Sequence, residues 1–408
     1  MKISNWELRE KPSLAPKLVT KKGLNTSIQS SFGVPDDPDY VFGIAPNGDN
    51  SAMAVSLSTN VIKLYAPSTG QFLGDCLGHS TTISEIAYPD ASAPYFLCSS
   101  SADGTVRAWD TRVRKQVAML MAPPSQELWS FSLGGGSGNV VAAGANAQIL
   151  CWDWRTKQQL ACLEDCHTEA VTQVAFHPTK KEKLVSASVD GLMCIFDTKG
   201  DINDDEGMEF VMSVGTSVSR IGFYGRNQEK LWCLTHIESL SIWNFEEAMI
   251  EADFCDTRAK ASCNWTLPPV DYLIHCHYAA AVDSLWLVAG TQEGTVGYFP
   301  LTYSDGRGSV SVGMIGTSSA VLEGGHMGVV RSVWSPHDGH PSMHGGLEGL
   351  FCWTGGEDGR LCSWTENPSN LDISSAWVSS GLVRRRPSRC KQRHMPYRYK
   401  SEKEKSSD

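Results

Sequence analysis

The chain has 408 residues and a formal net charge of −10, and no apolar run in it reaches the roughly 20 residues that a membrane-spanning helix needs. The first residues, MKISNWELREKPS, carry scattered charges and no apolar segment, so we expect neither a secretory signal nor a membrane partner. Thirteen cysteines without a CxxC pair indicate small core residues in a reducing compartment, the cytosol or the nucleus.

The charge is divided unevenly along the chain. Residues 384–408 hold ten Lys or Arg and three Asp or Glu, a net charge of +7, which leaves −17 on residues 1–383. An acidic body disfavours nucleic acid as its main ligand and favours basic proteins. We therefore expect basic protein partners for the body of the molecule.

A glycine followed by an alternating strand and an aromatic residue returns along the chain. Four clear copies read DGTVRAW, DGLMCIF, EGTVGYF and DGRLCSW, and three weaker copies, NVIKLY, AQILCW and SLSIW, share their phase. The aromatic ends are Tyr65, Trp109, Trp152, Phe196, Trp243, Phe299 and Trp364, at intervals of 44, 43, 44, 47, 56 and 65 residues. Seven copies predict a single all-β domain, a seven-bladed β-propeller, with six blades and a distorted seventh as the alternative.

Each clear copy predicts a hairpin. An apolar strand precedes the turn in the four copies, at Tyr95–Ser101, Lys183–Ser188, Leu285–Gly290 and Leu350–Gly356. The turn glycine can adopt the positive φ that a tight hairpin needs. One four-stranded blade cannot bury both of its faces, so the blades must stack around a common axis.

The two ends of the chain suggest how the ring closes. Residues 1–25 form an N-terminal arm with one possible strand, Lys17–Lys21, which could complete the last blade, and Ile373–Val378 is the competing candidate. Closure of this kind removes an open sheet edge. We expect the propeller to occupy residues 26–383 and residues 384–408 to form a basic, disordered tail.

Trp-Asp pairs begin at Trp109 and Trp152, and Gly-His pairs end at His79 and His326, a pattern that resembles the WD-repeat (WD40) family. In that family a histidine, a strand Ser or Thr, a turn aspartate and a strand tryptophan form a hydrogen-bonded chain. The resemblance implies such sets at His79, Ser99, Asp103 and Trp109, at His167, Ser186 and Asp190, and at His326, Thr354, Asp358 and Trp364. Phe196 replaces the tryptophan of the middle set. Such residues satisfy one another inside a blade, so we expect a structural role rather than catalysis.

The sequences WDTR and WDWR place Arg112 and Arg155 just past the third strands of two consecutive blades, and therefore on one rim. These motifs resemble those of WD proteins that dock on the damaged-DNA-binding adaptor of cullin-RING ubiquitin ligases. An arginine fork there can pair with a partner carboxylate. The alternative is that both arginines simply face water.

The basic tail is typical of a nuclear import signal. Its candidate import residues are Arg384, Arg385, Arg386, Arg389, Lys391 and Arg393. Tyr397 and Tyr399 interleave with basic residues, which would permit base stacking on RNA, and a solubilising tail is the alternative.

No catalytic, cofactor-binding or metal-binding set emerges from the sequence. His337, His340 and His344 have the spacing of one helix face, but Gly339 and Pro341 argue against a helix and no cysteine is near. The glycine run at 134–138 lacks the ending of a phosphate loop.

Within WD proteins, the chain most resembles the WD repeat-containing protein 89-like group, whose plant members are GIGANTUS-like. The resemblance spans about Tyr40 to Thr365 and includes RHMPYRYK near the C-terminal end. It implies a non-enzymatic scaffold in nucleus and cytoplasm, including the nucleolus, linked to growth control through ribosome biogenesis or function. Its clients would be basic ribosome-assembly or ribosomal proteins. The alternative is a substrate receptor of a cullin-RING ligase.

Overall fold

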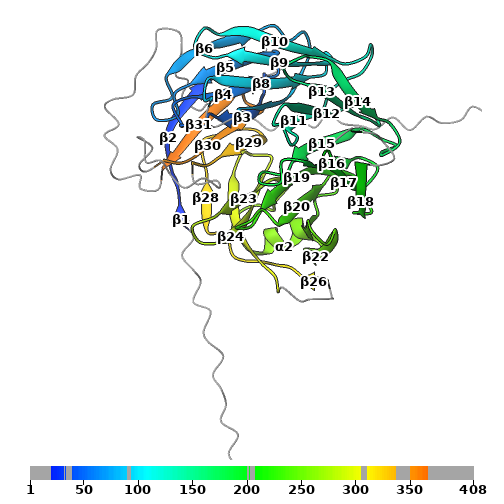
Figure 1. Ribbon diagram of the computed structural model, residues 1–408. Coiled ribbons are helices and arrows are strands. Elements are labelled where there is room, and N and C mark those ends of the chain that lie inside the picture. The colour runs from blue at the N-terminus through cyan, green and yellow to red at the C-terminus, as the bar shows by residue number, and fades with distance from the viewer. Residues whose placement is uncertain are drawn as a thin grey trace, which may run out of the picture.

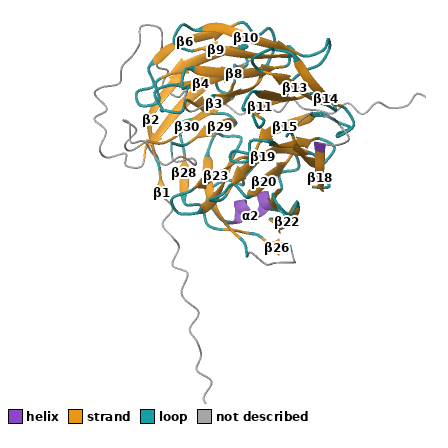
Figure 2. Ribbon diagram, in the orientation of Figure 1, coloured by secondary structure: helices purple, strands orange, loops and turns teal. Residues whose placement is uncertain are grey.

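The computed structural model describes residues 20–31, 33, 39–89, 93–199, 202, 207–304, 310–336 and 350–365. These residues form seven mainly antiparallel sheets arranged around an axis (Figure 1), and nearly all of their regular structure is strand (Figure 2). The first strands of the sheets contact one another in a closed ring, β3, β7, β11, β15, β19, β23, β29 and again β3. The seven-bladed propeller is thus confirmed, and the six-bladed alternative is wrong.

Each blade contains four main strands, numbered outward from the axis. Blade 1 has β3 (Val41–Pro46), β4 (Met53–Leu57), β5 (Val61–Tyr65) and β6 (Phe72–Leu77). Blade 2 has β7 (Ile83–Ala87), β8 (Phe96–Ser101), β9 (Thr105–Asp110) and β10 (Lys115–Met121). Blade 3 has β11 (Ser130–Gly134), β12 (Val140–Gly144), β13 (Ile149–Asp153) and β14 (Gln159–Leu163). Blade 4 has β15 (Val171–Phe176), β16 (Lys183–Ser188), β17 (Leu192–Asp197) and β18 (Met208–Ser213).

The last three blades complete the ring, and blades 5 and 6 carry additional elements. Blade 5 has β19 (Val218–Tyr224), β20 (Lys230–Thr235), β21 (Leu240–Asn244) and β22 (Met249–Asp253). Blade 6 has β23 (Tyr272–Ala279), β24 (Ser284–Gly290), β25 (Val296–Thr302) and β28 (Ala320–Leu322). Blade 7 has β29 (Val330–Trp334), β30 (Leu350–Gly356), β31 (Arg360–Thr365) and β2 (Gly23–Gln29). The additions are β1 (Thr20–Lys21), β26 (Ser311–Val312), β27 (Met314–Ile315) and the helix α2 (Thr257–Cys263).

The seven aromatic anchors all lie in the third strands of their blades and are buried, in agreement with the repeat. The residue five positions before each anchor occupies the turn and has a positive φ. In the clear copies it is a glycine, Gly104, Gly191, Gly294 or Gly359, and in the weaker copies it is Asn60, Ala147 or Glu238, with φ of 62°, 59° and 62°. The weaker copies therefore keep the turn geometry without the glycine, at a cost in backbone strain.

The ring is closed by an N-terminal strand, but not by the one predicted. β2 pairs antiparallel with β31, from Gly23 opposite Thr365 to Gln29 opposite Arg360. The predicted Lys17–Lys21 is wrong, because its described residues, Thr20 and Lys21, form β1 and pair in parallel with β28 of blade 6. The reason is that pairing at an outer edge depends on backbone groups, so the polar stretch GLNTSIQ gave little signal. The competitor Ile373–Val378 and the tail lie outside the described residues.

The long intervals before Phe299 and Trp364 have structural causes. In the link from blade 5 to blade 6, α2 packs near β27, and Trp265 and Val270 join the core between the two blades. After β25, the chain runs back to the edge of blade 5, where β26 pairs in parallel with β22. In the described part of the chain, no helix has the length and apolar character needed to cross a membrane.

Candidate functional site

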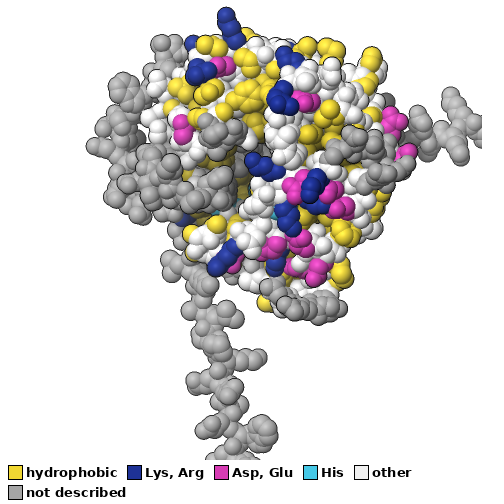
Figure 3. Space-filling view, in the orientation of Figure 1, with side chains coloured by type: hydrophobic (Ala, Val, Ile, Leu, Met, Phe, Trp, Pro, Cys, Tyr) yellow, Lys and Arg dark blue, Asp and Glu magenta, His cyan; other side chains and the backbone are white. Residues whose placement is uncertain are grey.

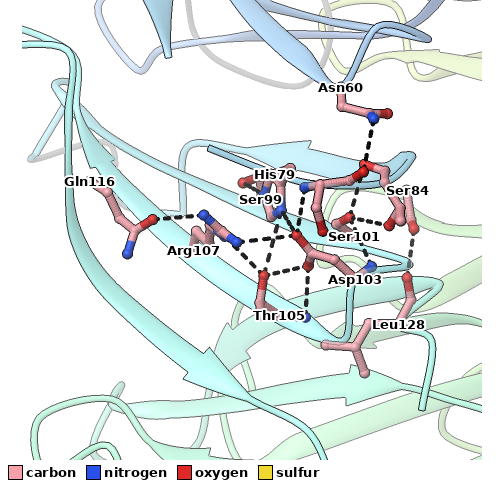
Figure 4. A network of polar contacts seen from close by, with 12 residues as sticks. Asn60, His79, Ser84, Ser99, Ser101, Asp103, Thr105, Arg107, Gln116 and Leu128 are labelled. Carbon is pink, nitrogen blue, oxygen red and sulfur yellow. Dashed lines mark hydrogen bonds and ion pairs between the residues drawn. The ribbon is translucent and has the colours of Figure 1, made fainter. Parts of the chain in front are cut away.

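The His79 set predicted in blade 2 comes together as a chain of hydrogen bonds (Figure 4). The His79 Nδ1–H donates to Asp103 Oδ2 at 2.9 Å, and the Ser99 hydroxyl donates to His79 Nε2 at 2.7 Å. The Trp109 indole N–H donates to Ser99 Oγ at 2.9 Å. Ser99 has no exposed surface, so a substrate cannot reach its hydroxyl. This arrangement stabilises a blade and offers no nucleophile.

Asp103 is the centre of that network. It also accepts hydrogen bonds from the backbone N–H groups of Ser80 and Thr105 and from the Arg107 guanidinium, at 3.1, 3.1 and 3.2 Å. Burial opposes ionisation, but the hydrogen bonds from Thr105, His79 and Ser80 outweigh it and lower the pKa of Asp103. Burial lowers the pKa of His79, although Asp103 acts in the other direction, so the ring is neutral at pH 7.

The other two predicted sets are also brought together. In blade 4, His167 lies 3.0 Å from Asp190 and 2.7 Å from Ser186, and the buried Phe196 takes the place of the tryptophan without its N–H group. Blade 7 holds a complete set. His326 lies 3.0 Å from Asp358 and 2.8 Å from Thr354, whose hydroxyl accepts from Trp364 at 2.8 Å.

Blade 5 contains a reduced form of the histidine network, with only its tryptophan and serine, which the sequence reasoning missed. The Trp243 indole N–H donates to Ser241 Oγ of its own strand at 2.8 Å, so a local partner replaces the missing histidine chain. The signal available in the sequence was the serine two positions before the anchor tryptophan, inside SLSIW.

Arg112 and Arg155 follow β9 and β13, third strands that run in the same direction, so both lie on one rim. This rim is made of the loops from first to second and from third to fourth strands, and we call it the WDxR rim. Two nitrogens of Arg112 bind both carboxylate oxygens of Asp110, at 3.0 and 2.6 Å, and its guanidinium lies 3.7 Å from the centre of the Tyr95 ring. Arg155 is 68% exposed and lies 3.8 Å from Asp153. Arg155 is therefore the freer of the two for a partner carboxylate.

A cavity of about 280 Å³ lies on the propeller axis and is lined by first strands of all seven blades. Three of its side chains can carry charge. Glu85 accepts a hydrogen bond from the Phe131 N–H at 2.9 Å, Arg220 donates to the Ile274 carbonyl at 3.3 Å, and His275 packs edge-on against Trp232. Sequence reasoning missed these residues, because nothing local links single polar residues on three separate strands.

Burial governs the ionisation of the cavity residues. It raises the pKa of Glu85 to about 7, with the Phe131 N–H and Arg220 opposing it. Burial, together with Arg220 and His277, lowers the pKa of His275 to about 3. At neutral pH the cavity thus holds one fixed cation, one neutral imidazole and one carboxyl near half-ionisation.

We expect Glu85→Gln to stabilise the protein at pH 8 and to have little effect at pH 4.5. The folded state keeps the Glu85 proton up to about pH 7, while the unfolded chain releases it near the ordinary value of 4.5, so ionisation lowers stability as pH rises between these values. A glutamine escapes that loss, and its advantage should grow by about 1–3 kcal/mol from pH 4.5 to 8. Chemical denaturation across this pH range measures it. The same exchange at the exposed Glu127 is the control, and an advantage independent of pH would contradict the assignment.

Other sequence candidates hold no ligand site in the described residues. No group of three His, Cys, Asp or Glu side chains there has the geometry to hold a metal ion. His337, His340 and His344, and the six basic residues of the tail, lie outside the described part of the chain.

Comparison with known proteins agrees with this architecture. Residues 70–110 and 157–197 match the family model described as WD domain, G-beta repeat. The WD repeat-containing protein GTS1 of Arabidopsis thaliana is 51% identical over 97% of this chain and 98% of its own length. The WD repeat-containing protein 89 homolog of Dictyostelium discoideum is 30% identical over 86% of this chain and 90% of its own. The ribosome biogenesis protein WDR12 homolog of Oryza sativa subsp. japonica is 29% identical over 30% of this chain and 28% of its own.

Proposed function

Because the chain belongs to the WD-repeat family, in the group that contains WD repeat-containing protein 89 homologs and plant GIGANTUS-like proteins, we propose that it is a scaffold for ribosome assembly. It holds basic ribosome-assembly or ribosomal proteins and contributes in this way to growth control. The propellers of this family are generally non-enzymatic protein-binding scaffolds. Rigid blades with buried polar networks hold binding loops in place, which suits this role.

The observation that carries the proposal is the charge of the body. Residues 1–383 carry −17, and an acidic surface attracts proteins rich in Lys and Arg while it repels phosphate backbones. The Oryza sativa relative named for ribosome biogenesis adds support over a short segment only.

The proposal places the protein in the nucleus, the nucleolus and the cytoplasm. Import rests on the basic run that begins at Arg384 and ends at Arg393, which is a composition typical of nuclear import signals. Direct RNA contact by this tail is not part of the proposal, since the net charge of the body opposes it.

The second candidate function is that of a cullin-RING substrate receptor. The specific observation in its favour is the exposed pair of arginines on the WDxR rim, with Arg112 over the Tyr95 ring and Arg155 open to solvent. A bidentate guanidinium on an aromatic ring is well placed to recognise a partner carboxylate. Arg112, however, must first break its hydrogen bonds to Asp110, which reduces the binding free energy that a partner carboxylate can contribute.

Affinity purification of the intact protein and of the Arg112→Ala/Arg155→Ala variant, followed by mass spectrometry, separates the two functions. We expect ribosomal and ribosome-assembly proteins in equal amounts with both, because neither arginine lies on an acidic surface. Lys181→Ala/Lys199→Ala, which removes two exposed cations from the same rim, is the matched control. Recovery of a ligase adaptor and a cullin with the intact protein and the control, but not with the arginine variant, would establish the receptor in place of the scaffold.

A further inference from the structure

The two rims of the propeller differ in charge. The rim opposite the WDxR rim consists of the turns from second to third strands and the links to the next blade, and we call it the Asp-Gly rim. The exposed acidic residues in its described turns and links are Glu127, Glu164, Asp165, Glu169, Asp256, Glu293 and Glu323. In these same segments Arg258 is the exposed cation. The described Asp-Gly rim is therefore strongly acidic.

The WDxR rim has the opposite balance. The exposed cations of its described loops are Arg112, Arg114, Arg155, Lys157, Lys181, Lys199 and Arg226, and the exposed acidic residues are Asp49, Glu246, Glu247 and Asp283. Several of these charges are compensated by neighbours, as in the pairs Lys180–Glu246 and Arg226–Asp283. Figure 3 shows acidic and basic side chains next to one another on one face of the molecule. Among the strands, Lys183 of β16 pairs with Asp197 of β17 and Glu209 of β18.

The acidic residues of the Asp-Gly rim concentrate at blade 3. Three of them, Glu164, Asp165 and Glu169, lie in the six-residue stretch 164–169 of the link to blade 4. The N–H of Ala147 donates to the Glu169 carbonyl at 3.1 Å, which ties this link to the turn 145–148. Within the described residues, no ion pair engages these three carboxylates.

An exposed tryptophan lies beside the same turn. The Trp129 backbone N–H donates to the Gly144 carbonyl at 2.9 Å. The residue as a whole is 43% exposed, and it lines the axial cavity. Ile237 and Met327, on the same rim at blades 5 and 7, are 68% and 56% exposed. Large apolar side chains among carboxylates are the composition of a protein-binding surface, and tryptophan is the residue type most often dominant in such interfaces.

We propose that the blade 3 acidic patch, defined by Glu127, Trp129, Glu164, Asp165 and Glu169, binds a lysine- and arginine-rich segment of a client protein. This inference rests on the proposed scaffold function and names the surface that the same client uses. Each exposed ion pair contributes little alone, so affinity arises from several carboxylates acting together and from a guanidinium or apolar side chain packed on Trp129. Binding through such a surface weakens as salt concentration rises.

The test uses two matched charge reversals in the full-length protein. Glu164→Lys/Asp165→Lys changes two consecutive exposed carboxyls on the acidic patch, and Glu246→Lys/Glu247→Lys makes the same change on the WDxR rim. The probe is a fluorescent peptide of alternating Lys, Arg and Gly with one Trp, and its binding is followed by anisotropy. We expect at least about tenfold weaker binding for the first variant and less than about twofold for the second. Trp129→Ala should weaken binding about fivefold or more.

Equal loss for the two reversals would overturn the proposal, because net charge alone would then explain binding. Unchanged binding by Glu164→Lys/Asp165→Lys would overturn it as well. Circular dichroism and thermal unfolding of each variant show whether a loss reflects misfolding. Purification from cells separates this inference from the scaffold function: basic ribosomal clients recovered with the intact protein and with both variants would reject the patch and keep the function, and their absence from the intact protein would reject the function.

Discussion

Removing residues 20–31 is expected to open the ring and to destabilise the propeller more than any point substitution. β2 covers the full length of β31, and Ile28 is buried against the core that contains Trp353 and Leu361. The Ser30 N–H and hydroxyl both donate to the Gly359 carbonyl, at 2.9 and 2.8 Å. Without the strand, an apolar sheet edge faces solvent and invites aggregation. We expect a loss of at least about 5 kcal/mol, or on the order of 10 °C in Tm.

Thermal unfolding and size-exclusion chromatography measure this effect. Deletion of residues 1–19, which precede the described strands, is the matched control and should leave Tm within about 2 °C of the intact value. A shortened chain without residues 20–31 that remains monomeric and keeps its Tm would show that another segment closes blade 7.

Asp103→Ala is expected to be the most damaging substitution in the blade 2 network, at about 3–5 kcal/mol. It removes the acceptor of His79, of two backbone N–H groups and of Arg107, and leaves these donors unpaired. Asp153→Ala is the control, because Asp153 lies on the WDxR rim and mainly caps the backbone of Arg155 and Thr156, so we expect about 1 kcal/mol or less. Urea unfolding of the three proteins gives the difference.

The stability difference between the intact protein and Asp103→Ala is expected to depend on pH. The pKa of Asp103 is lowered in the folded state, so its stabilising contribution is complete above the ordinary value of 3.8 and is lost as pH falls toward the lower folded value. The intact protein and Asp103→Ala should therefore approach each other in stability below pH 4. If the difference in the free energy of unfolding stays constant from pH 7 to pH 3, the negative charge of Asp103 does not stabilise the network.

The blades could be predicted from the sequence because each is marked by a short, continuous motif. A turn, an alternating strand and an aromatic anchor occupy seven consecutive residues, and the copies ending at Trp109, Phe196 and Trp364 carry it in full. The weaker copies kept the anchor and the phase, so Tyr65 and Trp152 still marked third strands even where Asn60 and Ala147 replaced glycine. Two of the three histidine sets could be carried over completely by resemblance to the family. In all three sets the Ser or Thr lies four residues before the turn aspartate and the aromatic residue six after it, while the histidine lies at a variable distance upstream.

The sequence predicted that an N-terminal strand closes the ring, but it did not predict which residues form that strand. The strand that pairs with β31 contains Ile28 as its buried apolar residue, and an isolated apolar position does not distinguish Gly23–Gln29 from Lys17–Lys21. The parallel additions β1 and β26 were not foreseen for the same reason. Backbone groups on an exposed edge accept a strand of almost any sequence, so geometry decides which segment pairs there.

The sequence by itself thus determined the fold class and the third-strand anchors, since both depend on local spacing within a repeat. The family resemblance supplied the membership of the blade networks, and the structure settled the count at seven blades rather than six. The tertiary structure alone decided which strand closes the ring, that Glu85, Arg220 and His275 share an axial cavity, and that carboxylates gather on one rim while cations gather on the other. These properties arise from residues on different blades, far apart in the sequence, that meet only because seven sheets surround one axis.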